Sequence, residues 1–332
     1  MQSLRYRSMP LVVGAMLAGS LLYGCKDTTT TPVTVDPNAD VTMAAPPAGK
    51  GIQVVIGPFD VPNGQEVQKN FYQKLASDSD IYVTKVEFRF NSGSHHLNIF
   101  KSDTTDVPDA IVDSFNALQF ESWDMVAASQ KGEYVWTLPP GTAIKLKAHQ
   151  QMDFQTHYVN AGTQSTPSGH GKAIINFWTT DKSNVTSLVG AVFSNNKALD
   201  LKPHTAQTYC KVVTPFDHDV SLLLMTGHFH SRGKTFTVGH WNGTKLTDTI
   251  YQSSAWSDPP ILQFATPLMV KAGESIAYIT TYENRTDNEI KFGSHVEVEE
   301  HANLFTFYYP GPANGKAVYD FAGGFLMKTE NI

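Results

Sequence analysis

Alternation of apolar and polar residues dominates the chain beyond residue 50. Short runs rich in β-branched and aromatic residues are separated by Gly, Pro, Asn and Asp, and no long run has a helical period. Such runs predict strands. The clearest are expected at 52–59, 81–90, 142–148, 152–159, 173–180, 234–241 and 275–282. The pattern therefore predicts an all-β protein.

Many short strands with turn residues between them favour antiparallel sandwiches or barrels. The stretch 181–206 interrupts the rhythm and is the best candidate for a junction. We expect two tandem antiparallel β-sandwiches, each jelly-roll-like, over residues 51–190 and 191–332. The length of the folded part allows two domains of ordinary size.

The first 25 residues have the features of an export signal. Arg5 and Arg7 precede an apolar run that ends at "LLYGC", and this run is too short to be a transmembrane helix. The stop resembles the lipobox of bacterial lipoproteins, which implies cleavage before Cys25 and a lipid on that cysteine. Lys26, rather than Asp, follows it, so the resemblance implies the outer membrane or surface of a Gram-negative cell envelope. The alternative is an ordinary signal peptide.

Composition narrows the possible partners. Residues 26–50 are rich in Thr, Pro and Ala, which predicts a flexible tether. The net charge is −6, without a strong basic block, which argues against a nucleic-acid partner. Membrane contact is expected through the lipid anchor only.

Cysteine usage predicts a fold without disulfides. Of the two cysteines, only Cys210 remains once Cys25 carries a lipid, so no internal pair can form. Cys210 is expected to be a buried, small apolar residue, with a reactive thiol as the alternative.

Histidines are the candidate chemistry. The chain has 12 of them, and imidazole is the commonest metal ligand; a site rich in histidine and poor in thiolate suits copper, zinc or non-haem iron. In "MTGHFH", His228 and His230 point to the same side of a predicted strand, with Cα atoms about 6.6 Å apart. That spacing suits two imidazoles that converge on one ion.

The other candidates need a less regular strand or further support. His95 and His96 are neighbours, and on a regular strand they would point to opposite faces, so joint ligation requires a bulge or a strand end. Gly93 permits one; the alternative is one buried and one exposed histidine. His157, in "FQTHYV", taken alone is more often a core histidine than a ligand. Six further histidines are interpreted as surface or structural: His149, His170, His204, His218, His240 and His295.

Four motifs stand in order over residues 81–310: "HH", "LPPG" followed by a strand that ends in "THY", "HFHSRGK" and "EEHANLFTFYY". This order resembles the copper type II, ascorbate-dependent monooxygenases, the family of the peptidylglycine and dopamine hydroxylases. The resemblance implies one copper on His95, His96 and His157, and a second on His228, His230 and one more residue. It also implies a solvent-filled cleft between two sandwiches, O₂ as a co-substrate, and an external reductant such as ascorbate.

The third ligand of the second site departs from the family. His301 stands where the family has a methionine, and Ala302 stands where it has a cysteine. An imidazole favours Cu(II) more than a thioether does, and it also suits zinc. The change weakens the case for hydroxylation but not for metal binding. The alternative is that the alignment is shifted and this segment supplies no ligand.

The residues at the positions that bind substrate in this family differ as well. Thr226, Asn303 and Phe305 match the positions of an Arg, an Asn and a Tyr that hold a substrate carboxylate in the peptide-hydroxylating members. Without the guanidinium there is no bidentate clamp. We expect a small, neutral or apolar substrate and no hydroxylation of glycine-extended peptides.

Three functions remain open at this point. The first is a surface-anchored monooxygenase with two coppers. The second is a lipoprotein on the same scaffold that binds copper or zinc, or passes electrons, without catalysis. The third is a sandwich that binds carbohydrate or a protein partner and whose histidines are incidental.

Overall fold

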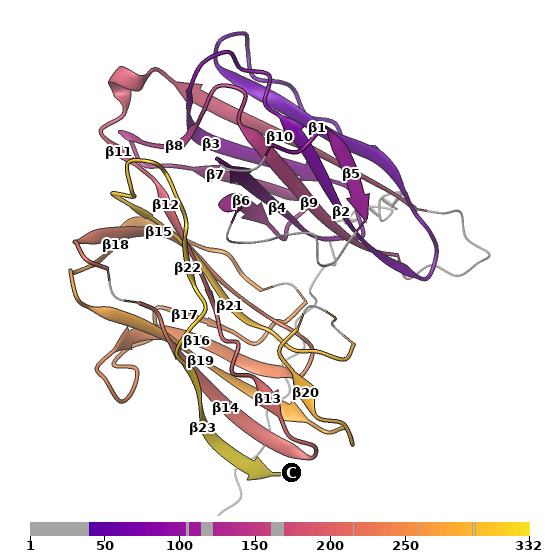
Figure 1. The fold of residues 1–332 in the computed structure, drawn as a ribbon, viewed down its shortest axis with the longest axis vertical. Helices are drawn as coiled ribbons and strands as arrows, with labels where there is room; N and C mark the ends of the chain where they lie inside the picture. Colours follow the sequence, from indigo (N-terminus) through magenta and orange to yellow (C-terminus); the bar gives the residue numbers. More distant parts are fainter. Residues whose placement is uncertain are drawn as a thin grey trace, which may run out of the picture. The chain divides into compact units, whose positions relative to one another are not determined.

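The computed structural model describes residues 40–103, 106–113, 122–160, 169–214, 216–257, 259–293, 295 and 297–332. Strands make up nearly all the regular structure of these residues, and the one helical element among them is a short 3-10 turn, η1 (Lys182–Asn184). The predicted all-β class is confirmed (Figure 1).

The first half of the chain forms a sandwich of two sheets. One sheet has the order β1-β10-β3-β8-β11, with β7 also on β3, and the other has the order β5-β2-β9-β4-β6. Their bounds are β1 Gly51–Val61, β2 Gln65–Lys74, β3 Ile81–Phe90, β4 Ser94–Ser102, β5 Ala110–Asp113, β6 Asp124–Ser129, β7 Glu133–Thr137, β8 Thr142–Leu146, β9 Gln151–Asn160, β10 Gly169–Thr180 and β11 Ser187–Leu188.

The second half forms two further five-stranded sheets, β18-β15-β21-β12-β22 and β17-β16-β19-β14-β23, and a small pair, β13-β20. Pairing is antiparallel apart from β8 with β11 and β12 with β22. The bounds are β12 Gly190–Asn195, β13 Asp200–Leu201, β14 Thr205–Val212, β15 Val220–Phe229, β16 Gly233–Trp241, β17 Tyr251–Ser253, β18 Leu262–Val270, β19 Ser275–Asn284, β20 Ile290–Lys291, β21 Ala302–Tyr309, β22 Val318–Asp320 and β23 Gly324–Asn331.

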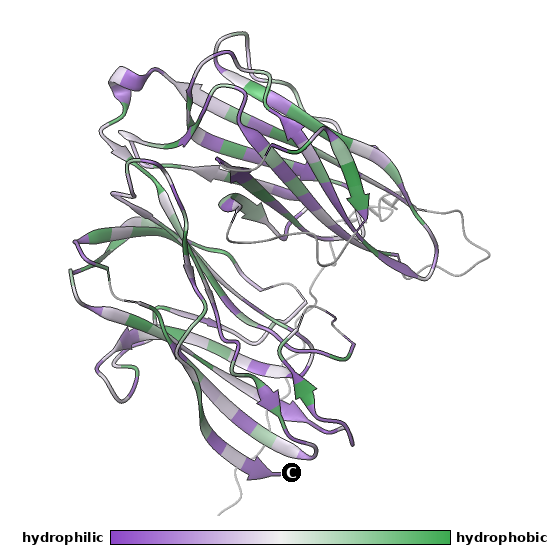
Figure 2. Cartoon of the chain, in the orientation of Figure 1, coloured by the Kyte–Doolittle hydropathy of each residue, from purple (hydrophilic) through white to green (hydrophobic). Residues whose placement is uncertain are grey.

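The strands expected from alternation are present, and β3 has the predicted bounds. Figure 2 shows hydrophilic and hydrophobic residues alternating along many strands. Other strands were not predicted, among them β2 and β12. β12 is buried at every position, and a strand covered on both faces does not alternate. The stretch 181–206 contains the passage from β11, in a sheet of the first half, to β12, in a sheet of the second half, although it includes these strands and is not irregular throughout.

Apolar packing is continuous from the first pair of sheets to the second. One core cluster combines residues of the first sandwich with Leu223, Leu224 and Phe307. The ring centroids of Trp136 and Phe307 are 4.6 Å apart. Close packing of this kind fixes the position of the elements that it joins.

Hydrogen bonds add to this contact near the end of the chain. The hydroxyl of Tyr319, in β22, donates to the carbonyl of Trp123 and accepts the backbone N–H of Met125 at 3.2 Å. Asp124 accepts the backbone N–H of Ala317 at 3.1 Å. The edge strand of the second half is thereby tied to β6 of the first.

The described end of the predicted tether is not loose. The carbonyl of Met43 accepts a hydrogen bond from Gln53 at 3.1 Å, and that of Ala44 accepts one from Asn176 at 2.8 Å. Residues 40–50 are thus held against β1 and β10, because the polar side chains of these strands bond their backbone.

Other predictions fall at the start of the chain or on cysteine. Residues 1–25, with the predicted lipid site Cys25, lie outside the described residues. The described part of the chain contains no helix long and apolar enough to cross a membrane. Cys210 is buried and its thiol is free, and burial raises its pKa to about 11. It is a small core residue, as predicted.

Candidate metal centre

The first histidine triad lies where β4 meets β9. His96 and His157 are direct partners across the two strands, and the register shifts between Ser94 and His96, so that His95 is an extra residue. Such a bulge turns a neighbouring side chain to the same side. Gly93, with a φ of +88°, supplies the left-handed backbone that precedes it. The irregularity that joint ligation requires is therefore present.

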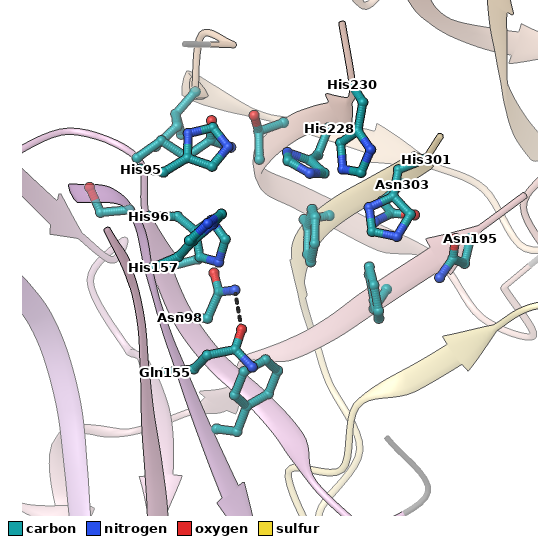
Figure 3. Close-up of a pocket in the computed structure, with 18 of the residues that line it drawn as sticks. His95, His96, Asn98, Gln155, His157, Asn195, His228, His230, His301 and Asn303 are labelled. Carbon is teal, nitrogen blue, oxygen red and sulfur yellow. Dashed lines mark hydrogen bonds between the residues drawn. The ribbon is translucent and has the colours of Figure 1, made fainter. Parts of the chain in front are cut away.

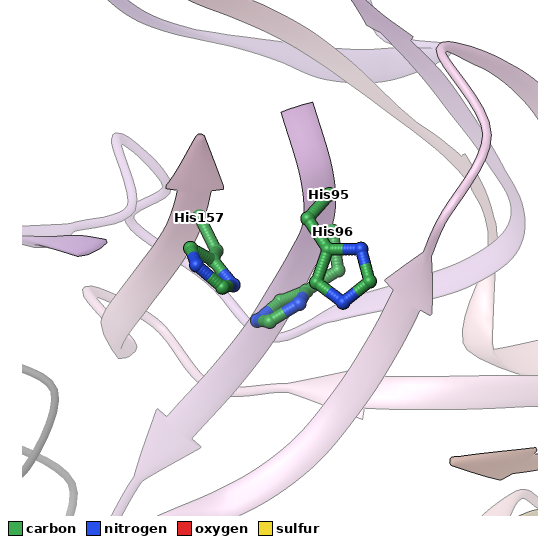
Figure 4. Close-up of side chains that lie close together, drawn as sticks. All are labelled: His95, His96 and His157. Carbon is green, nitrogen blue, oxygen red and sulfur yellow. The ribbon is translucent and has the colours of Figure 1, made fainter. Parts of the chain in front are cut away.

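The three rings of this triad converge (Figure 4). Their centroids are 5.3 Å apart for His95 and His96, 5.2 Å for His95 and His157, and 5.0 Å for His96 and His157. One ligand atom from each ring lies within 4.8 Å of those of the other two.

The second triad lies where the end of β15 meets the start of β21. His228 is in β15, His230 follows the strand, and His301 immediately precedes β21. The ring centroids are 5.5 Å apart for His228 and His230, 5.7 Å for His228 and His301, and 4.5 Å for His230 and His301. Their ligand atoms also lie within 4.8 Å of one another.

Neighbouring groups orient two of the rings. Nε2 of His157 donates to the carboxylate of Glu66 at 2.6 Å, so Nδ1 carries the lone pair of the neutral ring. Nδ1 of His230 donates to the carbonyl of Glu299 at 3.0 Å, so Nε2 carries its lone pair. A histidine ligand that donates its other nitrogen in this way has a fixed tautomer and direction.

Burial keeps most of these imidazoles neutral. It lowers the pKa of His95 and of His230 to about 4. It also lowers the pKa of His96, His228 and His301 well below the usual value, and neighbouring imidazoles add to the effect. The neutral ring is the form that binds a metal.

A buried carboxylate fixes the backbone of the second triad. Glu300 is fully buried and accepts the backbone N–H groups of His230, of His301 at 2.9 Å and of Arg232 at 3.2 Å. Burial raises its pKa to about 7, against the effect of these hydrogen bonds. Glu300 thus joins the end of β15 to the start of β21.

The guanidinium of Arg232 donates to the carbonyl of Glu297 at 2.6 Å. This contact joins the turn after β15 to the segment that precedes β21. It points away from a catalytic role for this residue.

A row of amides lies beside the first triad on the same face of the sheet. Asn98 donates to Gln155 at 3.1 Å (Figure 3), and Gln155 donates to Asn70 at 3.2 Å. Asn98 and Gln155 stand two residues from His96 and His157. Sequence reasoning missed them, although the period of two along a strand places them on the same face as the histidines.

Two residues before Gln155, on the same face of β9, lies a carboxyl group that is buried and unpaired. Asp153, opposite Tyr72 and Phe100, is fully buried, and neither of its oxygens has a hydrogen-bond partner. Burial raises its pKa to about 8, so the side chain is largely protonated at neutral pH.

Both triads line one cavity of about 310 Å³. Thr226, Asn303 and Phe305, the predicted substrate residues, also line it. Of the other lining residues, seven are apolar or aromatic and seven are polar, five of these being amides: Gln68, Asn98, Phe100, Ala128, Ser129, Gln130, Gln155, Phe193, Asn195, Lys197, Leu224, Ile261, Phe292 and Phe307. The structure thus brings every predicted site residue of the described chain to the same place.

Two lining residues of β12 extend the predicted substrate region. Phe193 stacks on Phe305, with ring centroids 4.5 Å apart and an interplanar angle of 16°. Asn195 is the cross-strand partner of Asn303, and the Oδ1 atoms of both are buried without a hydrogen-bond partner. They were missed because β12 itself was not predicted.

The other histidines do not join the cavity. Five contact an aspartate: His149 with Asp78, His170 with Asp40, His204 with Asp287, His218 with Asp217 and His240 with Asp248. His295 is exposed. These are the surface and structural roles expected from the sequence.

The residues of each triad fit a metal ion. Three imidazoles supply nitrogen donors at suitable separations, and the buried Nδ1 of His301 has no hydrogen-bond partner in the structure. Three neutral nitrogen donors suit copper and zinc. Clusters of exposed carboxylates often occur without a metal, but both of these triads consist of histidines.

No family model and no curated protein matches the chain. Among solved structures, a recombinant N-glycanase F (PNGase F) has a TM-score of 0.34 and 9% identity, with 85% of this chain and 100% of that chain covered. PNGase F, a glycosylasparaginase from Flavobacterium meningosepticum, has a TM-score of 0.32 and 9% identity, with 83% and 100% covered. These likenesses are too distant to support any argument about function.

Proposed function

We propose that this protein is a copper-dependent monooxygenase. Its two histidine triads would each hold one copper ion, and an external reductant such as ascorbate would supply electrons. The reaction would be R–H + O₂ + 2e⁻ + 2H⁺ → R–OH + H₂O, on a small molecule. Copper, when bound, supplies the one-electron redox chemistry and O₂ activation that no side chain here provides.

The observation that carries this proposal is the shared cavity. Storage of a metal ion needs a single triad, whereas here two complete triads face one cavity of about 310 Å³ with a partly apolar wall. Cavities of roughly this size hold small organic ligands. The combination suits a reaction that uses metal ions and a bound substrate together.

The protein's own groups would hold and orient the ligands. Glu66 fixes the ring of His157, the carbonyl of Glu299 fixes that of His230, and Glu300 fixes the backbone between His230 and His301. Burial keeps the rings of His230 and His301 neutral, so each has a lone pair for the metal.

The lining supports a neutral or apolar substrate. Phe193, Phe305 and Ile261 offer apolar surface, and Thr226 donates its hydroxyl to the carbonyl of Pro260 at 3.1 Å. The lining contains no arginine, and the ammonium of its one lysine, Lys197, lies 4.4 Å from the centroid of the Phe321 ring. A bidentate carboxylate clamp is therefore missing from the described lining.

The test is O₂ consumption by the copper-loaded full-length chain with ascorbate, in the presence of small apolar and aromatic compounds. We expect a compound that stimulates O₂ uptake and appears as a product carrying one atom of ¹⁸O from ¹⁸O₂. The zinc-loaded protein and the His157→Ala and His301→Ala variants should not produce it. His240→Ala, which changes a surface histidine, should remain active.

A second candidate rests on His301. A third imidazole in place of a thioether favours Cu(II) and zinc, as in a copper- or zinc-binding or electron-transfer lipoprotein without hydroxylase activity. Copper that stays oxidised in ascorbate, with no O₂ uptake for any compound, would support this candidate and contradict the monooxygenase.

A further inference from the structure

The two triads lie against each other. The ring centroid of His228, in the second triad, is 6.0 Å from that of His95 and 6.4 Å from that of His96, both in the first triad. Within the triads the corresponding separations run from 4.5 to 5.7 Å. The gap between triads is thus only slightly wider than the gaps inside them.

These separations can be compared with those expected for rings that bind the same metal ion. A metal–nitrogen bond is about 2.0–2.1 Å long, so the centre of a coordinating ring lies roughly 3 Å from its ion. Two rings on the same ion are therefore at most about 6 Å apart. His95 and His228 stand near that limit, although they belong to different triads, which leaves no room for a layer of protein between two bound ions.

We propose that the six histidines form a single binuclear copper site, with the two ions close enough to share a bridging ligand. This differs from the two separated copper ions, facing each other across a solvent-filled cleft, that the resemblance implies. The inference rests on the proposed function, since it requires that both triads bind copper.

The donor set agrees with a paired site. Because His301 takes the methionine position, each triad offers three imidazoles, and the two ions would have matching ligands. Ions with different ligands have different redox preferences, which suits electron transfer from one to the other. Matching ligands instead suit two ions that gain and lose electrons together.

The packing around the site holds the triads at this separation. Phe307, two strand positions beyond Phe305, packs on Trp136 of the first sandwich. Tyr319 bonds the backbone at Trp123 and Met125. The apolar packing between the two halves therefore holds the two triads at this short separation.

The test compares bound copper with unpaired spins. The full-length chain is loaded with Cu(II), copper is counted by elemental analysis, and spins are counted by electron paramagnetic resonance. We expect two coppers per chain and far fewer than one spin per copper, because the two spins couple. In His157→Ala and in His301→Ala, one copper with a full one-spin signal should remain.

The outcomes separate the two claims. Two coppers per chain with one full spin on each would overturn the binuclear site and leave the metal-binding proposal intact. Fewer than two coppers in the wild type would overturn both. Two variants, one on each triad, are used so that a folding defect in one does not decide the result, and circular dichroism verifies the fold of each.

Discussion

At the scale of single residues, the proposed copper chemistry depends most on His301. Its imidazole takes the place of a soft thioether in the resembling family. We predict that His301→Met makes bound copper easier to reduce, because a thioether favours Cu(I). A redox titration of the copper-loaded variant should show a higher reduction potential than the wild type. His240→Met, at the surface, is the matched control, and an unchanged potential in His301→Met would argue that His301 is not a ligand.

Asp153 gives a prediction about pH that does not depend on metal. Burial raises the pKa of this carboxyl group to about 8 in the fold, compared with about 3.9 in an unfolded chain. The folded state therefore keeps a proton that the unfolded state releases. The free energy of unfolding should fall as pH rises from about 4 to about 8, by at most about 1.4 kcal/mol per pH unit.

We predict that Asp153→Asn reduces this pH dependence and makes the protein more stable than the wild type at pH 8. Urea unfolding at pH 5 and at pH 8 measures both effects. Asp60→Asn, at an exposed aspartate, should change neither. A wild type and an Asp153→Asn variant with the same pH dependence would show that Asp153 is ionised in the fold.

At the scale of elements, Glu300 connects two strand ends. It is buried and accepts three backbone N–H groups from the segments that carry His230 and His301. We predict that Glu300→Gln costs about 1–3 kcal/mol of stability, because an amide nitrogen would face a donor there. Copper affinity of the second triad should fall by about 10–100-fold, as for other groups that support metal ligands.

Calorimetric titration with copper and urea unfolding measure these two effects. Glu297→Gln, three residues earlier in the chain and exposed, is the matched control. An unchanged second binding step in Glu300→Gln would show that the carboxylate does not position the ligands.

Individual strands differ in how well they can be predicted from the sequence. Strands with one polar face, such as β3 and β19, can be predicted from alternation. The bulge at His95 was one of two alternatives for the adjacent histidines, and the structure shows it. β12 and β2 are not visible in this way. Their positions are covered on both sides or carry polar side chains into the interior, as Asn70 does, so apolar periodicity is lost. Phe193 and Asn195, which were missed at the site, lie on β12, whereas Gln155 lies on the predicted strand β9 and was missed although it shares a face with His157.

At the scale of the whole folded chain, the two pairs of sheets share an apolar contact. Phe307, from β21, belongs to the core cluster of the first sandwich. We predict that the wild type unfolds in one cooperative step and that Phe307→Ala lowers stability by about 3–5 kcal/mol, as for a large side chain removed from a core.

Scanning calorimetry tests this prediction. Phe325→Ala, at a phenylalanine that is 41% exposed, should unfold at nearly the wild-type temperature. Two well-separated unfolding steps in the wild-type protein would contradict a shared core and, with it, a fixed distance between the triads.

The copper content of the purified full-length chain tests the central claim most directly. After copper loading and removal of excess metal, elemental analysis should find two ions per wild-type chain. His157→Ala and His301→Ala should each retain one, and His240→Ala should retain two. A wild-type chain that binds no copper, or triad variants that bind as much as the wild type, would contradict the assignment of the six histidines as metal ligands.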